Sequence, residues 1–156
     1  MIRIDIPGRT TILLEYLVID FNGTLATDGS LIHRVREKLN ELSENIDIHV
    51  VTADTFGKAK DETQNVKCKL IIIKGENQNL QKARYIEGLE EKKVVAIGNG
   101  MNDTLMLKNS ALGIAVIQQE GIAVESLQNA DIICSNILDA IDLLLKPMRI
   151  VATLRN

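Results

Sequence analysis

The feature that most constrains the fold of this sequence is the regular alternation of short apolar runs with segments of helical periodicity. Apolar runs recur every ~20–25 residues, and between them apolar residues return at the spacing of one helix face. This alternation is typical of βαβ units, which build a mainly parallel sheet with helices on both faces. We therefore predict a doubly wound α/β fold in a single domain over residues 1–156. The predicted strands are 2–6, 11–19, 46–51, 68–73, 93–97, 112–116 and 131–134, and the predicted helices are 31–43, 55–64, 77–89, 102–108, 122–127 and 137–145. We expect Ser30 to cap the first of these helices, the strand over 68–73 to be buried, and Leu80 to lie on the apolar face of the helix over 77–89.

Three short segments complete this description. Residues 2–6 alternate between apolar and charged side chains, as a half-buried strand does, and Pro7-Gly8 follows as a turn. We predict that residues 1–12 contribute the first strand of an N-terminal β-hairpin, whose second strand runs into the centre of the sheet. A short flap is predicted over residues 21–30. After Pro147 the tail fits a helix and a strand equally well.

Composition excludes several classes of protein. Hydrophobic residues make up 46% of the chain, enough for one core, and because aromatic residues make up only 3% that core must consist mainly of aliphatic side chains. The net charge is -3 without any block of Lys or Arg, so we expect no nucleic-acid partner. No apolar run approaches the ~20 residues that span a bilayer, and the N-terminus does not resemble a signal peptide. We therefore expect no membrane partner and a cytoplasmic location, with Cys68 and Cys134 as reduced thiols.

Polar side chains cluster where three of the predicted strands end. In a parallel sheet these ends share one edge, and ligands bind there at the topological switch point. Carboxylates, Asn side-chain oxygens and backbone carbonyls form the hard oxygen environment that Mg²⁺ prefers. The hydroxyl of Thr52 and the neighbouring backbone N–H groups suit phosphate oxygens. The three clusters are Asp20-Phe21-Asn22, Thr52-Ala53-Asp54 and Asn99-Gly100-Met101-Asn102-Asp103.

These clusters resemble, in order, the motifs of the haloacid dehalogenase (HAD) superfamily of phosphohydrolases. Residues 20–24, Asp-Phe-Asn-Gly-Thr, resemble its Asp-x-Asp-x-Thr signature, and Thr52 ends the second strand as its second motif requires. Lys82 resembles the third-motif Lys, and residues 98–103, Gly-Asn-Gly-Met-Asn-Asp, resemble Gly-Asp-Gly-x-Asn-Asp. Residues 94–116 look especially like the phosphorylation domain of P-type ATPases. The resemblance covers nearly the whole chain and implies a HAD-like Rossmannoid fold.

The resemblance also implies a reaction and a role for each matching residue. Asp20 would attack phosphorus in line and form an aspartyl-phosphate. Thr52 and Lys82 would hold the transferring phosphoryl group and stabilise its developing charge. Mg²⁺ would screen the repulsion between carboxylate and phosphate. The implied catalytic residues are Asp20, Asn22, Thr52 and Lys82; the implied phosphate-binding residues are Thr52, Ala53, Lys82 and Asn102; the implied metal ligands are Asp20, Asn22 through its backbone carbonyl, Asn99 and Asp103.

The sequence departs from the family pattern at two positions. Asn22 stands where the family has the Asp that acts as general acid and base, and a carboxamide does not titrate in the useful range. General acid–base catalysis typically contributes about 10²–10⁴-fold, so we expect slow hydrolysis of the aspartyl-phosphate. Asn99 replaces a metal-ligand Asp, so one negative charge is missing and Mg²⁺ affinity should fall. We interpret the site as attenuated or specialised.

The chain has no room for the cap domain from which HAD enzymes usually take their substrate specificity. Only residues 21–30 could form a flap after the first motif. Still fewer residues separate the strand predicted over 68–73 from the helix predicted over 77–89. An open site implies a phosphorylated substrate that can be macromolecular, or a cap supplied by a partner or by another subunit of a homo-oligomer. The resemblance to P-type ATPases does not extend to their membrane helices or to their nucleotide-binding insert. This chain is therefore not expected to pump ions.

Several alternatives stay open on the sequence alone. Lys74, at the end of an apolar run, is a rival to Lys82 as the phosphate-binding lysine. Asp54 fits either an N-cap of the following helix or a catalytic group. Because Asn22 and Asn99 make the site more neutral, the chain could be a non-catalytic phosphate- or Mg²⁺-responsive regulatory module on the same fold. A flavodoxin-like receiver also phosphorylates an Asp at a strand end, but the acidic pair that precedes that strand in receivers is absent here.

Overall fold

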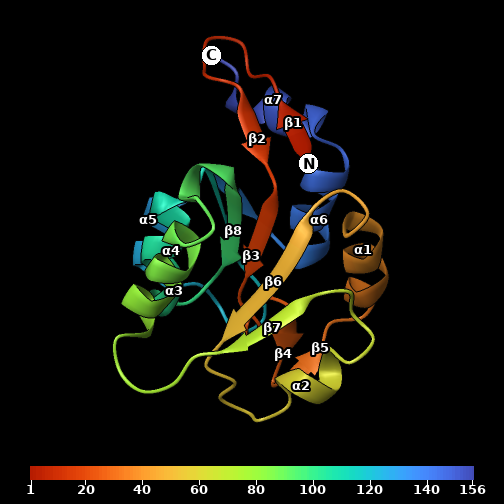
Figure 1. The fold of residues 1–156 in the computed structure, drawn as a ribbon, viewed down its shortest axis with the longest axis vertical. Coiled ribbons are helices and arrows are strands. Elements are labelled where there is room, and N and C mark those ends of the chain that lie inside the picture. The colour runs from red at the N-terminus through yellow and green to blue at the C-terminus, as the bar shows by residue number, and fades with distance from the viewer.

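A six-stranded parallel sheet forms the centre of the computed structural model, which describes residues 1–156 (Figure 1). Its strands are β3 (Tyr16–Ile19), β6 (Asp47–Thr52), β7 (Lys69–Ile72), β8 (Val94–Gly98), β9 (Leu112–Val116) and β10 (Ile132–Cys134). The strand order is β10-β9-β8-β3-β6-β7, and every neighbouring pair is parallel. From β3 the chain builds outwards through β6 and β7, and then returns to β8 on the other side. The predicted doubly wound sheet is confirmed, and its switch point lies between β3 and β8.

Helices cover both faces of this sheet (Figure 1). On one face α1 (Val35–Leu42) packs against α6 (Ile137–Leu145). On the other face α4 (Thr104–Asn109) lies between α3 (Gln78–Glu87) and α5 (Val124–Asn129). The sheet is therefore the middle layer of three.

The central strand β3 is buried on both of its faces. Leu17 and Ile19 belong to the hydrophobic core under α1 and α6, whereas Val18 belongs to the cluster under α3 and α4. Successive side chains of a strand point to opposite faces, so a strand covered on both sides reads as a continuous apolar run. Asp20 is the first residue after this strand, and the buried strand fixes its position.

An antiparallel hairpin precedes the sheet, at the end opposite to Asp20 (Figure 1). β1 (Ile2–Ile4) pairs with β2 (Ile12–Leu14), and beyond Glu15 the chain continues into β3. The tail is a helix, α7 (Met148–Leu154), which contacts β1 through its buried side. The choice that the sequence left open for the tail is thereby resolved.

The residues expected to form a flap fold into a second, smaller hairpin of β4 (Ala26–Thr27) and β5 (Ser30–Leu31). Both residues of its Asp28-Gly29 turn have positive φ, 51° and 77°, as a type I′ turn requires. The prediction of a helix from residue 31 with Ser30 as its N-cap is therefore wrong. The Asp-Gly turn signal outweighs the helical spacing that follows it, and α1 begins only at Val35.

Three other sequence predictions need correction. The helix predicted over 55–64 is a single turn, α2 (Ala59–Glu62), because the preceding loop closes with its own Gly57 N–H to Asp54 C=O hydrogen bond. β7 was predicted to be buried, but it is the edge strand, and Ile72 is 40% exposed. On α3 the predicted apolar face included Leu80, which is exposed, whereas Lys82 lies on the buried face.

Two expectations about the chemistry of the chain also meet the structure. Cys68 and Cys134 are both free thiols, as expected, and burial raises the pKa of each. None of the helices combines the length and apolar character that crossing a membrane would need.

We predict that Gly29→Ala destabilises the protein more than Gly57→Ala does. At Gly29 the added Cβ would lie 2.7 Å from Cβ of Phe56, at a φ of 77°. The positive φ costs about 1–2 kcal/mol and the overpacking about 1–3 kcal/mol more. Gly57 has a similar φ of 66° but open space around its Cβ, so only the first cost applies. Urea denaturation measures both, and equal losses would show that the flap does not rest on Phe56.

Candidate active site

The structure brings Asp20, Lys82 and Asp103 together at the carboxyl edge of the sheet. Asp20 follows β3, Asp103 ends the short 3₁₀ helix η2 (Met101–Asp103) after β8, and Lys82 reaches them from α3. The Nζ atom of Lys82 donates to Oδ1 of Asp20 and to Oδ1 of Asp103, at 2.6 Å each. The Lys82 and Asp103 side chains are fully buried, and the Asp20 side chain keeps 8% exposure. The three charges thus meet at the switch point, where the strand-end rule places a ligand.

Burial and charge together set the protonation of this trio. Burial raises the pKa of Asp20 to about 7, and the charge of Asp103 adds to the rise while Lys82 opposes it. Burial alone would lower the pKa of Lys82, but the two carboxylates outweigh it, so that pKa is raised. Lys82 therefore stays protonated, and Asp20 can change its charge near neutral pH.

Backbone N–H groups hold the second oxygen of Asp103. Its Oδ2 accepts hydrogen bonds from the N–H of Asn99 at 3.0 Å and of Gly100 at 2.9 Å. A Cβ at Gly98 would lie 2.5 Å from Cγ of Asp103, so glycine is what allows the end of β8 to approach this closely. Both Asp103 oxygens therefore have partners within the chain, and Asp103 holds Lys82 against the end of the strand.

Thr52 lies at the end of β6, the neighbour of β3 on its other side. It is fully buried, and its Oγ1 accepts a hydrogen bond from the N–H of Asp54 at 2.9 Å. Oδ1 of Asp54 accepts from the N–H of Lys58 and of Ala59, at 3.0 Å each, so the Asp54 carboxylate binds the N-terminal N–H groups of α2 although Lys58 is the N-cap residue. The hydroxyl proton of Thr52 remains free for a ligand, with half-buried Ala53 beside it.

Asn22 presents a buried polar atom that has no partner. The turn around it is held by Phe21, whose C=O accepts the N–H groups of Thr24, Leu25 and Ala26. Oδ1 of Asn22 is buried and makes no hydrogen bond, and it is the one buried side-chain nitrogen or oxygen in the structure of which this is true. A buried polar atom left unpaired costs free energy, so this oxygen is suited to a partner that a ligand brings.

The remaining predicted site residues are tied to the surrounding structure. Oδ1 of Asn99 accepts the hydroxyl hydrogen bond of Thr24 at 3.1 Å. Nδ2 of Asn102 donates to Oε1 of Gln78 on α3, at 3.0 Å, which fixes that carboxamide. Lys74 is exposed and forms no ion pair, so the structure brings Lys82 rather than its rival to Asp20.

Sequence reasoning missed the loop between β9 and α5, which also reaches this site. Nε2 of Gln118 in that loop donates to the carbonyls of Gly23 and Thr24, at 3.0 and 2.8 Å. The strand-end rule applied to β9 would have pointed to this loop. A glutamine that binds backbone carbonyls carries no motif, however, so only the folded structure reveals the contact.

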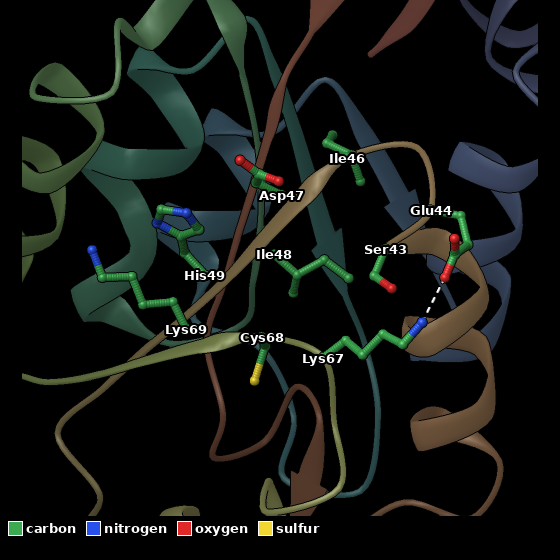
Figure 2. A pocket seen from close by; sticks show the side chains of 9 residues that line it. All are labelled: Ser43, Glu44, Ile46, Asp47, Ile48, His49, Lys67, Cys68 and Lys69. Atoms are coloured by element: carbon green, nitrogen blue, oxygen red, sulfur yellow. Dashed lines mark hydrogen bonds and ion pairs between the residues drawn. The ribbon is translucent and has the colours of Figure 1, made fainter.

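A separate cavity of about 490 Å³ lies at the opposite end of β6 and β7 (Figure 2). None of the predicted site residues lines it, and two of its charges, Glu44 and Lys67, already form an ion pair at 2.6 Å. His49 there is bound through Nδ1 to the Tyr85 hydroxyl at 2.7 Å, a structural role. We place the candidate site at Asp20 because the buried, paired charges converge there and not at this cavity.

The oxygens around Asp20 fit a magnesium ion. Lys82 binds Oδ1 of Asp20 and leaves Oδ2 to other partners, Oδ1 of Asn22 is unpartnered, and Oδ1 of Asn99 accepts one hydrogen bond. These are the hard oxygen donors that Mg²⁺ prefers, beside waters and phosphate. Asp103 fits less well as a direct ligand because both of its oxygens are already engaged.

Comparison with known proteins now gives this geometry a family. Residues 76–136 match the family model of haloacid dehalogenase-like hydrolases. This segment of the chain, from residue 76 to residue 136, belongs to the haloacid dehalogenase-like hydrolases. An uncharacterised protein of Methanocaldococcus jannaschii is 43% identical over 84 residues, which cover 51% of this chain and 90% of that protein. A soluble P-type ATPase-like phosphatase of the same organism is 25% identical over 123 residues, which cover 77% of this chain and 45% of that protein.

Solved HAD structures share the fold. The cobalt-bound deoxy-D-mannose-octulosonate 8-phosphate phosphatase of Haemophilus influenzae superposes with a TM-score of 0.72 at 13% identity, over 92% of this chain and 94% of that one. The 3-deoxy-D-manno-octulosonate 8-phosphate phosphatase of Moraxella catarrhalis, in complex with magnesium, phosphate and its sugar, gives 0.68 at 16% identity, over 91% and 94%. At these identities the likeness establishes the HAD fold, which here has no cap domain.

We predict that Asp20→Asn makes the HAD domain more stable relative to wild type as the pH rises. Native Asp20 has a pKa of about 7 and the ordinary value is 3.8, so the native state binds this proton more tightly than the unfolded chain does. Wild-type stability therefore falls as the pH rises between these two values, by about 1.4 kcal/mol for each unit of pKa difference. The Asn variant lacks this titrating group, so its free energy of unfolding does not fall in this way as the pH rises.

Urea denaturation at several pH values, with a chelator present to keep metal ions away, measures this difference. If the gap between wild type and Asp20→Asn stays constant from about pH 4 to about pH 7, the window between the two pKa values, the raised pKa is refuted.

Proposed function

We propose that this protein is a Mg²⁺-dependent phosphohydrolase or phosphotransferase that acts through an aspartyl-phosphate on Asp20. The observation that carries the proposal is the buried Lys82 ammonium, held 2.6 Å from Oδ1 of both Asp20 and Asp103 at the switch point. It orients the Asp20 carboxylate through Oδ1 and leaves Oδ2 to face a substrate. A relative named as a phosphatase and a neighbour in complex with magnesium and phosphate support the same chemistry.

Asp20 supplies the nucleophile in this proposal. Its Oδ2 forms a bond to phosphorus while the bond from phosphorus to the leaving oxygen breaks, and the leaving group departs with that electron pair. Lys82, bound to Oδ1, keeps the carboxylate in place and neutralises part of the charge around it. Water then attacks phosphorus in a hydrolase, or an acceptor hydroxyl does so in a transferase, and the Asp20 carboxylate is released.

The remaining predicted residues bind the phosphoryl group and the metal. The Thr52 hydroxyl and the backbone beside Ala53 would hold phosphoryl oxygens, with Lys82, while Asn102 would line the same position from η2. The Asp20 carboxylate, the Asn22 carbonyl and the Asn99 side-chain oxygen would hold Mg²⁺, with Asp103 in support. The ion would supply charge screening between the carboxylate and the incoming phosphate.

Asn22 makes the proposed enzyme slow at one particular step. A carboxamide can orient a water or a leaving group, but it neither gives up nor takes up a proton at neutral pH. The leaving group must therefore take its proton from solvent, and the attacking water must lose its proton to solvent. Breakdown of the aspartyl-phosphate suffers most, so the intermediate is long-lived.

The absence of a cap domain guides the substrate and partners that we propose. The chain adds only the small flap of β4 and β5 after Asp20 and no cap domain, so the substrate that we propose is a phosphorylated molecule that can be as large as a macromolecule. A partner or a second subunit could complete the enclosure, so a homo-oligomer is compatible with the proposal. We retain the proposals of a cytoplasmic location and of no nucleic-acid partner, which rest on the sequence.

One specific observation favours a second candidate function, a phosphate- or Mg²⁺-responsive module without turnover. Asn22 and Asn99 both stand where the family pattern has Asp, so the ionised site carries two carboxylates and one ammonium only. Such a module would be stabilised by Mg²⁺ with phosphate without consuming any ester.

We predict that wild-type protein hydrolyses an aryl phosphate and acetyl phosphate slowly and only with Mg²⁺. Asp20→Asn should abolish this turnover because the nucleophile is gone. Asn22→Asp should raise it about 10²-fold, since it restores a proton donor and acceptor. Steady-state release of phosphate measures all three proteins.

Asn109→Asp serves as the matched control, because Asn109 is exposed and gains the same charge away from the site. If neither wild type nor Asn22→Asp turns over either substrate, the enzyme proposal fails. Mg²⁺-dependent thermal stabilisation of the inactive wild type would then favour the module.

A further inference from the structure

The loop between β9 and α5, residues Ile117–Ala123, closes a ring of hydrogen bonds around the segment that follows β3. We call this segment, residues 20–26, the Asp20 loop. The Thr24 hydroxyl donates to Oδ1 of Asn99, whose Nδ2 donates to the carbonyl of Gly121 at 3.0 Å. The N–H of Gly121 donates to the carbonyl of Gln118 at 2.9 Å. Nε2 of Gln118 then donates to the Thr24 carbonyl, which returns the ring to its start. The ring ties the chain after β3, β8 and β9 into one unit.

The side chain of Gln118 makes more hydrogen bonds than any other side chain of this ring. Its Nε2 lies 3.0 Å from the Gly23 carbonyl and 2.8 Å from the Thr24 carbonyl, and its Oε1 lies 2.7 Å from the backbone N of Ile137. Two carbonyls require a donor and an N–H requires an acceptor, so the orientation of this carboxamide is fixed by its partners. Gln118 therefore joins the Asp20 loop to the first turn of α6.

The ring also gives a reason for a carboxamide at Asn99. Its Nδ2 donates to a backbone carbonyl, and its own carbonyl accepts the N–H of Ala123 at 2.8 Å. A carboxylate at position 99 would place an oxygen about 3 Å from the Gly121 oxygen, where two acceptors repel each other. The added Cβ of a Gly23 variant would lie 2.4 Å from Nδ2 of Asn99, so the two loops are packed closely as well as bonded.

We propose that Gln118 is a positioning residue for the Asp20 loop and that it acts through this ring. The inference rests on the proposed function, because its purpose is to hold the Asn22 carbonyl and side chain where a phosphoryl group and Mg²⁺ would bind. Gln118 binds the two residues after Asn22 from the loop after β9, whereas Thr52 ends β6 on the other side of β3 in the sheet. Gln118 adds side-chain hydrogen bonds to a loop that is otherwise held mainly by its own backbone hydrogen bonds.

The test uses the full chain with Gln118→Glu and Gln118→Met, each of which removes the two donors while keeping the length of the side chain. Gln119→Glu is the matched control, because Gln119 is exposed and makes no side-chain hydrogen bond. Amide hydrogen exchange of the segment 20–26, followed by mass spectrometry without metal, reports the order of the loop. The Mg²⁺ concentration that half-saturates thermal stabilisation in the presence of inorganic phosphate reports the binding geometry.

Both Gln118 variants should exchange faster in segment 20–26 than wild type and Gln119→Glu, while β9 and α6 stay protected. Their half-saturating Mg²⁺ concentration should rise about tenfold, the lower end of what loss of an outer-shell partner costs. Unchanged exchange in this segment overturns the proposal. Faster exchange throughout the sheet with an unchanged Mg²⁺ midpoint also overturns it, since Gln118 would then be only structural.

The two levels of inference can fail separately. If wild-type protein responds to neither Mg²⁺ nor phosphate and turns over no ester, the proposed function fails. Local loosening of segment 20–26 in both Gln118 variants would still support the positioning of the loop by Gln118.

Discussion

The interaction on which the rest of the site depends is the buried ion pair network of Lys82 with Asp20 and Asp103. A fully buried ammonium is tolerated only when charges and hydrogen bonds satisfy it, and here two carboxylates do so at 2.6 Å each. In return, Lys82 separates two carboxylates that would otherwise repel each other across the ends of β3 and β8. The network thus couples helix α3 to two strand ends, and it fixes the nucleophile proposed for the reaction.

The two Asn residues that depart from the family pattern have different physical positions. Both polar atoms of the Asn99 side chain have protein partners, on the Asp20 loop and on the loop after β9. Asn22, in contrast, keeps a buried oxygen without a partner. The first substitution is thus built into the structure, whereas the second leaves an unfilled interaction beside Asp20. In the mechanism that we propose, such a site would form the covalent intermediate more readily than it would release it.

Much of this arrangement could be predicted from the sequence, because the relevant signals are local. The apolar run that ends at Asp20 predicts a central strand, and the alternation of strands and helices predicts that three polar strand ends share one edge of the sheet. The start of α1 was misjudged because the helical spacing after Leu31 competes with the Asp28-Gly29 turn, which prevails. Leu80 was expected on the apolar face of its helix but is exposed, because the ion pairs of Lys82 turn a different face of α3 towards the sheet. The contacts of Gln118 involve backbone carbonyls more than 90 residues away, and nothing in a sequence encodes such partners.

The most direct test of the central claim is the intact mass of the protein, acid-quenched at short times after mixing with acetyl phosphate and Mg²⁺. The account predicts that wild type gains the mass of one phosphoryl group, that Asp20→Asn gains none, and that Asn22→Asp accumulates less because its intermediate breaks down faster. An adduct of the same size on Asp20→Asn, or turnover by wild type with no adduct at any time, would contradict the account.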